Sequence, residues 1–363
     1  MKNLLFFINY LGSGGAQRQI VELALGFKKR GYNVRFLIYQ REHSEFYYNY
    51  LIDRGINIDG VYEKNYFKRI WATRRYLRTH NFDVLISFLE VASFLSEVAA
   101  FPCKKWKLIV GERSADPAKF TSLKLRFFLQ CHILADYVVA NSYANINIVK
   151  EIAPMISAAK CKVIYNMLDG EKISPKKNFN FLSHNYVNLV VASSHRYLKN
   201  LNGLIEGVKL MPIEKRCKLH INWFGSNKFD DSLEKGMQKI EEYNLKEIFS
   251  FHKDTLDIYE YMKEADAIGL FSFFEGLPNA ICEGLLLAKP VVVTRVSDIP
   301  LIIEEDKNGF ICEADKPETI SNSLTKLVDC SAEKLKEMGE MNRLLGIKLF
   351  DKEKILNEYE NLF

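Results

Sequence analysis

The sequence has no apolar run long enough to cross a membrane. None of its hydrophobic stretches approaches the ~18 uninterrupted apolar residues of a transmembrane helix. The apolar start, Leu4 to Ile8, runs directly into Gly-Ser-Gly-Gly without a cleavage site of small residues, so we interpret it as a first β-strand and not as a signal peptide. These features argue against an integral membrane protein.

The chain also lacks the patterns of a disulfide framework or a metal site. Its seven cysteines are far apart and form no C-x-x-C pair, and its seven histidines show no H-E-x-x-H or similar spacing. We therefore expect a cytoplasmic protein and assign no metal-binding residue. Hydrophobic residues, in contrast, are abundant: they make up 48% of the 363 residues, enough to bury the cores of two or three domains.

Positive charge is unevenly distributed along the chain. Residues 1–170 contain 24 Lys and Arg against 14 Asp and Glu, whereas the remaining residues contain 26 against 31. A basic half suits nucleic acid, an anionic membrane surface or a phosphorylated substrate. Charge alone does not choose among these three.

Short apolar runs alternate with longer amphipathic segments in both halves of the chain, which predicts mostly parallel sheets covered by helices. The expected strands are 4–8, 34–39, 84–88, 108–110, 137–140, 189–192, 219–224, 248–251, 267–271 and 291–294. The expected helices are 16–30, 44–54, 91–100, 119–134, 143–153, from about 200, 231–243, 255–264, from 279, 299–304 and from about 332.

The polar segment between Met167 and Asn188 is typical of a linker. We therefore predict an α/β protein with two Rossmann-like domains, 1–170 and 171–345, which face each other across a cleft. The last residues, 346–363, are expected to form a helix that packs back on the N-terminal domain. Ligands of such sheets bind outside the carboxyl ends of the strands.

The first candidate motif is the glycine-rich run from Gly12 to Gly15, where the first strand turns into the first helix. Glycines there let the backbone approach an anion, and the helix amino end offers free N–H groups. A tight strand-to-helix turn is the alternative. The glycine-rich run is not a Walker loop, because no Gly-Lys-Ser/Thr follows it.

The second candidate motif follows the first strand of the second half. His195, Arg196 and Lys199 lie within five positions just before a helix. Three cationic side chains at the end of a strand could clamp a diphosphate. A solvated basic loop explains the same residues equally well.

The third motif, Phe274 to Leu285, carries the most information. It reads FEGLPNAICEGL, and Pro278 suits the first turn of a helix. Glu283 lies one turn into that helix, on the same face as Asn279, while Glu275 precedes its amino end. Two carboxylates around a helix amino end could bind several hydroxyls while backbone amides hold phosphate. An ordinary acidic helix start is the alternative.

With these motifs in order, the sequence resembles the family-four glycosyltransferases of the GT-B fold, retaining enzymes that use nucleotide sugars. The resemblance covers nearly the whole chain, and its most specific part is the E-x7-E pattern of Glu275 and Glu283 followed by Pro-Val-Val. The further matches are GGAQR, Val-Gly-Glu-Arg around Glu112, Asn141-Ser142, Val163 to Asn166, Lys199-Asn200, Phe224-Gly225 and Asn308-Gly309-Phe310.

The resemblance implies a role for each matched residue. Glu283 would bind the ribose hydroxyls of the donor, Glu275 the hydroxyls of the transferred sugar, and Lys199 the departing diphosphate. The implied catalytic residues are Lys199, Arg196 and Glu275. The implied substrate-binding residues are Gly14, Gly15, Glu112, Arg113, Asn141, His195, Gly225, Gly276, Leu277, Pro278, Asn279, Ala280 and Glu283.

Two positions depart from the family pattern. Ser194 stands where the family usually has an arginine, five residues before Lys199, so His195 or Arg196 would have to supply that charge. Arg113 stands where the family often has a histidine.

The expected function is therefore retaining transfer of a sugar from a nucleotide sugar to a hydroxyl of a glycan or lipid-linked acceptor. The resemblance implies no cofactor and no metal, with a UDP-sugar favoured over a GDP-sugar as co-substrate. The alternatives are a GT-B epimerase or phosphorylase and a non-catalytic membrane- or nucleic-acid-binding protein, although no nucleic-acid motif is present.

The acceptor is expected at the basic half of the chain. Cations between 64 and 78 are interleaved with aromatic and apolar residues, and residues 119–128 repeat the mixture. Such a helix could lie on an anionic bilayer at the inner face of the plasma membrane. Alternatively, its aromatic residues belong to the core and its cations are simply solvated.

Overall fold

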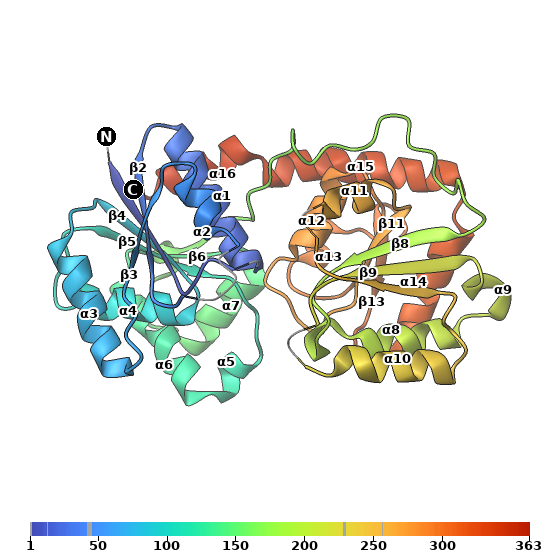
Figure 1. The fold of residues 1–363 in the computed structure, drawn as a ribbon, viewed down its shortest axis with the longest axis horizontal. Helices are drawn as coiled ribbons and strands as arrows, with labels where there is room; N and C mark the ends of the chain where they lie inside the picture. The colour runs from blue at the N-terminus through green and yellow to red at the C-terminus, as the bar shows by residue number, and fades with distance from the viewer. Residues whose placement is uncertain (1, 13, 42–45, 228–229, 256) are drawn as a thin grey trace. The chain divides into compact units, whose positions relative to one another are not determined.

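The computed structural model describes residues 2–12, 14–41, 46–227, 230–255 and 257–363, which form two compact units (Figure 1). Unit 1 comprises Met1–Met167 and Lys352–Phe363, and unit 2 comprises Leu168–Asp351. The sequence predicted boundaries at 170 and 345. The second boundary lies later because helix α15 (Ala332–Phe350) packs closely on α12 (Asn279–Leu286), so that a Cβ at Gly346 would lie 3.2 Å from Leu286.

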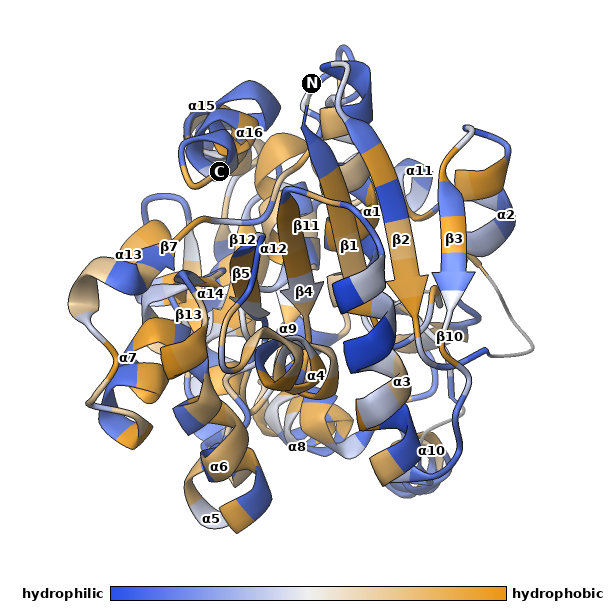
Figure 2. Ribbon diagram, turned by 90° about the vertical axis from the view of Figure 1, so that its left-hand side faces the viewer, coloured by the Kyte–Doolittle hydropathy of each residue, from blue (hydrophilic) through white to orange (hydrophobic). Residues whose placement is uncertain are grey.

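Unit 1 is built on a seven-stranded sheet in the order β3-β2-β1-β4-β5-β6-β7, with every neighbouring pair parallel. Its strands are β1 (Asn3–Ile8), β2 (Asn33–Ile38), β3 (Asn57–Gly60), β4 (Val84–Phe88), β5 (Lys107–Glu112), β6 (Tyr137–Ala140) and β7 (Cys161–Val163). The central strands are almost entirely buried, and β1 is largely orange in the hydropathy colouring of Figure 2. Burial on both faces explains their continuous apolar runs.

Helices cover both faces of this sheet. They are α1 (Gly15–Lys29), α2 (Tyr48–Ile52), α3 (Tyr66–Thr79), α4 (Glu90–Ala100), α5 (Ala118–Thr121), α6 (Leu123–Cys131), α7 (Tyr143–Ile152) and α16 (Lys352–Glu360), with short 3-10 turns η1 (His132–Leu134) and η2 (Ala158–Lys160). The C-terminal helix α16 packs on α1, where Leu356 is 1% exposed and Arg30 pairs with both Glu353 and Glu360 at 2.6 Å. The end of the chain is therefore part of unit 1.

Unit 2 repeats the architecture with a six-stranded parallel sheet in the order β10-β9-β8-β11-β12-β13. Its strands are β8 (Val187–Ala192), β9 (Leu219–Phe224), β10 (Phe249–His252), β11 (Ala267–Leu270), β12 (Val291–Thr294) and β13 (Gly309–Cys312). Besides α12 and α15 its helices are α8 (Leu201–Leu210), α9 (Ile213–Arg216), α10 (Ser232–Glu242), α11 (Ile258–Lys263), α13 (Ile299–Ile302) and α14 (Pro317–Asp329), with a 3-10 turn η3 (Tyr197–Lys199).

The predicted fold class, two Rossmann-like α/β domains, is confirmed. The predicted helix 119–134 is wrong as a single element, because Ser122 ends α5 and accepts a hydrogen bond from Leu125 N at the start of α6. Positions 44 and 45 of the predicted helix 44–54, and position 256 of the helix 255–264, lie outside the described residues. Within the described part of the chain, no helix is long and apolar enough to cross a membrane.

Candidate active site

The candidate site in unit 2 begins where two neighbouring strands end. Strands β8 and β11 are adjacent in the sheet, but the chain leaves β8 toward β9 and leaves β11 toward β12, so the strand order reverses between them. Such a reversal leaves a crevice at the carboxyl edge, where open α/β sheets bind ligands. The loops after the two strands meet there: Phe273 N donates to Leu198 O at 3.0 Å, and the Tyr197 ring stacks on Phe273.

This meeting of loops joins Lys199 to Glu275. Lys199 Nζ lies 2.5 Å from Glu275 Oε1, and Ser272 Oγ donates to the same oxygen at 2.7 Å. The two charged side chains are 13% and 15% exposed, so they are neither in bulk solvent nor fully enclosed. The geometry provides a cation and a carboxylate side by side at an accessible edge.

Lys199 is held by the residue that follows it. Asn200 adopts a left-handed conformation (φ 60°), accepts from Gly203 N at 3.0 Å, and donates to Ala314 O at 2.7 Å. Asparagine tolerates this conformation better than most residues and is a favourable helix N-cap. Asn200 was not among the predicted site residues, although an Asn three residues before Gly203 at a helix start is a visible signal in the sequence.

Three hydroxyl groups fix the loop that carries Glu275. Besides the bond from Ser272 to the carboxylate, Thr294 Oγ1 donates to Ser272 O at 2.7 Å, and Ser297 Oγ donates to Gly276 O. Thr294 is the last residue of β12, so the neighbouring strand supports the loop. None of the three was among the predicted site residues, because nothing in the spacing of 272, 294 and 297 reveals that their side chains converge.

Helix α12 places Glu283 behind the same loop. The helix begins at Asn279 with Pro278 at its N-cap, one position earlier than the first-turn placement that the sequence suggested, and Pro278 makes no side-chain cap. The first turn contains no acidic residue, so the positive end of the helix dipole is not offset there. Glu283 is 3% exposed, and Leu277 and Ala280 are also buried. Neither glutamate points into bulk solvent.

His195 does not fit the role of a diphosphate-binding cation. Its side chain is 2% exposed and packs against Trp223 and Phe251, with ring centroids 5.6 and 5.5 Å away. Burial lowers the pKa of His195, which favours the neutral ring. Between the two candidates for the missing family arginine, the structure therefore favours Arg196.

Arg196 lies near Asp230. Burial raises the pKa of Asp230, but hydrogen bonds from Ser232 and from Tyr197 N and the charge of Arg196 outweigh it, and the net shift is downward. Gly225 has a structural reason to be glycine, because a Cβ there would lie 2.0 Å from Ser193 O. The predicted residues from 193 to 283 thus gather at one edge of the unit 2 sheet.

In unit 1, the glycine-rich turn leads into α1 without a side-chain cap or an acidic residue in the first turn. Gly14 is the N-cap and Gly15 the first helical residue; Ser13 lies outside the described residues. A Cβ on Gly14 would lie 2.2 Å from Gln17 Oε1, so glycine allows a close approach here. This helix amino end remains suited to an anion.

Glu112 is occupied by a buried charge network. Its Oε2 accepts from Lys119 Nζ and its Oε1 lies 3.1 Å from His132 Nε2, while His132 Nδ1 lies 2.5 Å from Glu97 Oε1. Lys119 also donates to Ser114 O at 2.6 Å. Glu112, Lys119, His132 and Glu97 are all at most 2% exposed. The predicted substrate contact of Glu112 is therefore not favoured, because both of its oxygens already have partners.

The pKa shifts of this network follow from its pairing. Burial raises the pKa of Glu112, but the charge of Lys119 and the bonds from His132 outweigh it and lower the value to about 2. Burial likewise disfavours the charged His132 ring, yet Glu97 and Glu112 raise its pKa to about 10. The pKa of Glu97 is raised, mainly by burial and against the effect of His132.

Arg113 and Asn141 lie at the same carboxyl edge of the unit 1 sheet. Arg113 Nη2 donates to the Tyr359 hydroxyl, and its guanidinium lies 3.8 Å from the centre of the Phe88 ring. Asn141 is 4% exposed and accepts from Asn145 Nδ2 at 2.8 Å. Arg113 keeps its charge without a carboxylate partner among the described ion pairs, whereas Asn141 is a buried member of a polar cluster.

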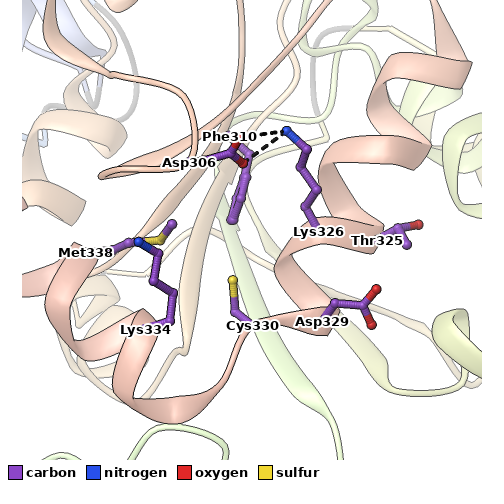
Figure 3. A pocket seen from close by; sticks show the side chains of 8 residues that line it. All are labelled: Asp306, Phe310, Thr325, Lys326, Asp329, Cys330, Lys334 and Met338. Carbon is purple, nitrogen blue, oxygen red and sulfur yellow. Dashed lines mark hydrogen bonds and ion pairs between the residues drawn. The ribbon is translucent and has the colours of Figure 1, made fainter.

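A separate hollow of about 280 Å³ lies at the opposite edge of the unit 2 sheet (Figure 3). Phe310 near the start of β13 and Met338 of α15 line it, and Lys326 reaches Asp306 at its rim, 3.0 Å away. Because it lies at the amino ends of the strands, it is not part of the candidate site. Across the described ranges, no three His, Cys, Asp or Glu side chains group as a metal site requires.

Two family models match consecutive parts of the chain. The model "Glycosyltransferase Family 4" matches residues 13–172, and the model "Glycosyl transferases group 1" matches residues 174–344. The chain belongs to the family-four glycosyltransferases. It therefore catalyses glycosyl transfer in glycoconjugate biosynthesis.

Relatives of this family-four glycosyltransferase match along its whole length. An uncharacterised glycosyltransferase of Haemophilus influenzae is 23% identical over 395 residues, covering 100% of both chains. The N-acetylgalactosamine-N,N'-diacetylbacillosaminyl-diphospho-undecaprenol 4-alpha-N-acetylgalactosaminyltransferase of Campylobacter jejuni is 23% identical over 377 residues, covering 99% of this chain and 98% of the relative. These relatives give no support to the epimerase alternative.

The fold of this glycosyltransferase is similar to that of Anabaena HepE, solved in complex with UDP-glucose. The TM-score is 0.86 at 18% identity, with 99% of both chains covered. The predicted GT-B fold is thereby confirmed.

Proposed function

We propose that this glycosyltransferase retains the configuration of the transferred sugar, works without a metal ion, and prefers a UDP-sugar over a GDP-sugar. The acceptor is a hydroxyl of a glycan or of a lipid-linked sugar. The observation that carries the proposal is the Lys199–Glu275 pair at the strand-order reversal, beside the amino end of α12.

In the proposed donor complex, each part of the nucleotide sugar has a partner in unit 2. Glu283 binds the ribose hydroxyls and Glu275 those of the sugar, while Lys199, Arg196 and the α12 amino end hold the diphosphate. Gly14 and Gly15, at the amino end of α1 in unit 1, contact substrate. Support for a uracil base comes from a structural neighbour that was solved with UDP-glucose.

The proposed mechanism relies on stabilising the leaving group. As the bond between sugar and phosphate lengthens, negative charge collects on the diphosphate, and a preorganised cation there lowers the barrier. The leaving phosphate takes the proton of the acceptor hydroxyl, which enters on the same face of the sugar. We assign no protein nucleophile to this step.

The donor assignment is tested by thermal shift with UDP-, GDP- and ADP-sugars. A ligand at 100 times its dissociation constant adds about 2.7 kcal/mol to the stability of the folded state. We expect a UDP-sugar to give the largest shift, and EDTA to leave turnover unchanged. Nuclear magnetic resonance of the product tests retention. A GDP- or ADP-sugar preference, loss of turnover in EDTA, or an inverted product would each contradict the matching part of the proposal.

For the acceptor, we propose that α3 and α6 contact an anionic membrane at its cytoplasmic face. Phe67 and Trp71 of α3 are 80% and 63% exposed, and Leu123 and Phe127 of α6 are 83% and 55% exposed. Both helices contact α4 between them, and Figure 2 shows hydrophilic and hydrophobic segments along α3. Support for a lipid-linked acceptor also comes from the name of the Campylobacter jejuni relative.

The cations of α3 divide into two groups. Arg74 donates to Val98 O at 2.7 Å and Arg78 to Cys103 O at 2.9 Å, so these two tie α3 to the last turn of α4 and to the chain that follows it. Leu77 is also buried, in the core. Lys68 and Arg75 of α3, and Lys64 just before the helix, remain on the surface with Phe67 and Trp71. The core alternative raised by the sequence therefore fits Leu77, whereas the exposure of Phe67 and Trp71 supports the proposal of membrane contact.

Membrane contact is tested by sedimentation with vesicles of phosphatidylglycerol. Replacing Phe67 and Trp71 with serine should reduce binding by about tenfold, since each loses apolar area that would enter the interface. Leu344→Ser on α15, which removes a side chain that is 72% exposed in unit 2, is the matched control. If Leu344→Ser reduces vesicle binding as much as the Phe67 and Trp71 substitutions do, or if the unmodified protein does not bind the vesicles, membrane contact is contradicted.

A further inference from the structure

In this structure, the two charged groups assigned to different parts of the donor are bonded to each other. Lys199 Nζ and Glu275 Oε1 are 2.5 Å apart, while the proposed function gives the diphosphate to Lys199 and the sugar hydroxyls to Glu275. A ligand that reaches Lys199 must therefore share it with Glu275 or displace Glu275 from it.

Glu275 cannot easily move away from Lys199. Ser272 Oγ donates to the same carboxylate oxygen at 2.7 Å, and Ser272 is itself fixed through its carbonyl by Thr294. The loop of Lys199 is tied to the loop of Glu275 by the bond from Phe273 N to Leu198 O at 3.0 Å. The carboxylate is consequently held beside the position where the diphosphate would lie.

A nucleotide sugar and a nucleoside diphosphate differ in what they offer this pair. The nucleotide sugar brings hydroxyl groups that can donate to the carboxylate and a diphosphate that can pair with the ammonium, so both charges keep partners. The nucleoside diphosphate brings only negative charge, which competes with Glu275 for Lys199 and is repelled by it. The repulsion is poorly screened because both side chains are at most 15% exposed.

We infer that Glu275 is a selectivity residue that weakens the binding of the free nucleoside diphosphate and so helps this product to leave. The inference rests on the proposed donor site and adds a second role to Glu275. Once the sugar has been transferred, its hydroxyls no longer satisfy the carboxylate, whose charge then competes with the diphosphate for Lys199 and weakens the binding of the diphosphate. Glu275 thus favours the donor over the spent nucleotide at one shared lysine.

The test is titration calorimetry of UDP binding to the full chain. Glu275→Gln keeps the shape of the side chain and its capacity to accept from Ser272, but removes the charge. We expect it to bind UDP about tenfold more tightly, or about 1.4 kcal/mol, while turnover falls. In the Lys199→Ala background, the same substitution should change UDP affinity less than twofold, because the competition is for that lysine.

Glu264→Gln provides the matched control. Glu264 pairs with Lys176 at 2.7 Å in the same unit, but both side chains are about half exposed and Glu264 precedes β11, at the other edge of the sheet. Glu264→Gln removes the same charge from the protein as Glu275→Gln does, so unchanged UDP affinity in the Glu264 variant excludes a general effect of net charge. An equal gain in both variants would overturn the inference.

The outcomes separate the inference from the proposed function. If the unmodified protein binds UDP and transfers sugar, but Glu275→Gln binds UDP equally or more weakly, the inference is wrong and the proposed donor site stands. If no UDP binding occurs in the unmodified protein or any variant, while GDP or ADP binds, the same comparison is made with that nucleotide. If none of the three binds to any variant, both the proposed donor site and the inference fail.

Discussion

Each unit contains a Lys–Glu pair at the carboxyl edge of its parallel sheet, and the two pairs differ in burial. Lys119 and Glu112 of unit 1 are 1% and 2% exposed. They pair with each other, Glu112 also bonds to His132, and Lys119 also donates to Ser114 O. Lys199 and Glu275 of unit 2 are 13% and 15% exposed, and among the described residues Ser272 is the one further side chain that bonds to the pair.

The difference separates a fully enclosed pair from a pair that a ligand can reach on the same scaffold. A buried pair with every oxygen satisfied stabilises the loop after β5 and has nothing left to offer a ligand. A pair that is partly exposed to solvent can exchange partners when a ligand binds. The resemblance to the family assigned substrate roles to Glu112 and Glu275 alike, and only their surroundings distinguish them.

The largest expected effect is on stability, from Lys119→Met. This substitution keeps most of the side-chain volume but leaves the buried Glu112 carboxylate with His132 as its remaining cationic partner among the described residues, which costs about 3–5 kcal/mol. Lys199→Met, its counterpart in unit 2, should cost less than Lys119→Met, because Glu275 is 15% exposed and water can partly replace the lysine. Urea denaturation of both variants measures the two costs. Equal costs would contradict the distinction between the pairs.

The next effect is on catalysis, from Lys199→Ala. Loss of one preorganised group that stabilises developing charge costs about 2.7–4 kcal/mol, so kcat should fall by about two to three orders of magnitude. Steady-state kinetics with the donor identified by thermal shift measures the change. Lys176→Ala, which removes a cation that is 49% exposed in the same unit, should leave kcat within about twofold as the control.

The buried network of unit 1 also predicts a dependence of stability on pH. The folded state raises the pKa of His132 from 6.5 to about 10, so its stabilising contribution is complete below pH 6.5 and is lost as the pH rises toward 10. Within that window, the free energy of unfolding should fall by up to about 1.4 kcal/mol per pH unit.

His132→Gln tests this dependence by removing the titrating ring. Urea denaturation between pH 6.5 and 9.5 should give a shallower slope in the variant than in the unmodified protein. Glu112 has the opposite sign: with a folded pKa of about 2, its contribution is present above its unfolded value of 4.5 and is lost as the pH falls toward 2. A wild-type slope that survives in His132→Gln would assign the alkaline loss to other groups.

Much of the fold was predictable because most strands are short, continuous apolar runs. The missed strands β3, β7 and β13 are edge strands of their sheets, and β3 and β7 have no fully buried residue. An edge strand with one covered side needs fewer apolar residues, so the sequence gives a weaker signal. Helix α14 was missed despite a clear signal, since Pro317 begins it and Ile320, Leu324 and Leu327 form its buried stripe.

The site was predictable only in part. The E-x7-E motif is local in sequence, and it located Glu275, Glu283 and the start of α12 closely. The contact of Lys199 with Glu275, 76 residues later, depends on the strand order and could not come from spacing. The enclosure of His195 by Trp223 and Phe251 is likewise set by tertiary packing, so the sequence suggested a cation at a position where the side chain is buried and its pKa is lowered.

The smallest expected effect concerns the third charged group at these edges, Arg113. Its guanidinium is held by a neutral hydroxyl, that of Tyr359 in the C-terminal helix, and by the face of Phe88. Because neither partner cancels its charge, Arg113 is closer in character to Lys199 than to Lys119. Tyr359→Phe keeps the buried ring and removes only the hydroxyl, which should cost about 1 kcal/mol of stability.

The Tyr359 hydroxyl also helps to position the Arg113 guanidinium. If Arg113 contacts substrate, as the resemblance implies, losing this hydroxyl should raise KM for donor or acceptor by a few-fold while kcat changes less. Urea denaturation and steady-state kinetics of Tyr359→Phe give the two values. Tyr32→Phe is the matched control, because its hydroxyl bonds to Glu360 of the same helix but makes no contact with Arg113. A KM that rises equally in both variants would mean that α16 acts on unit 1 through its packing alone.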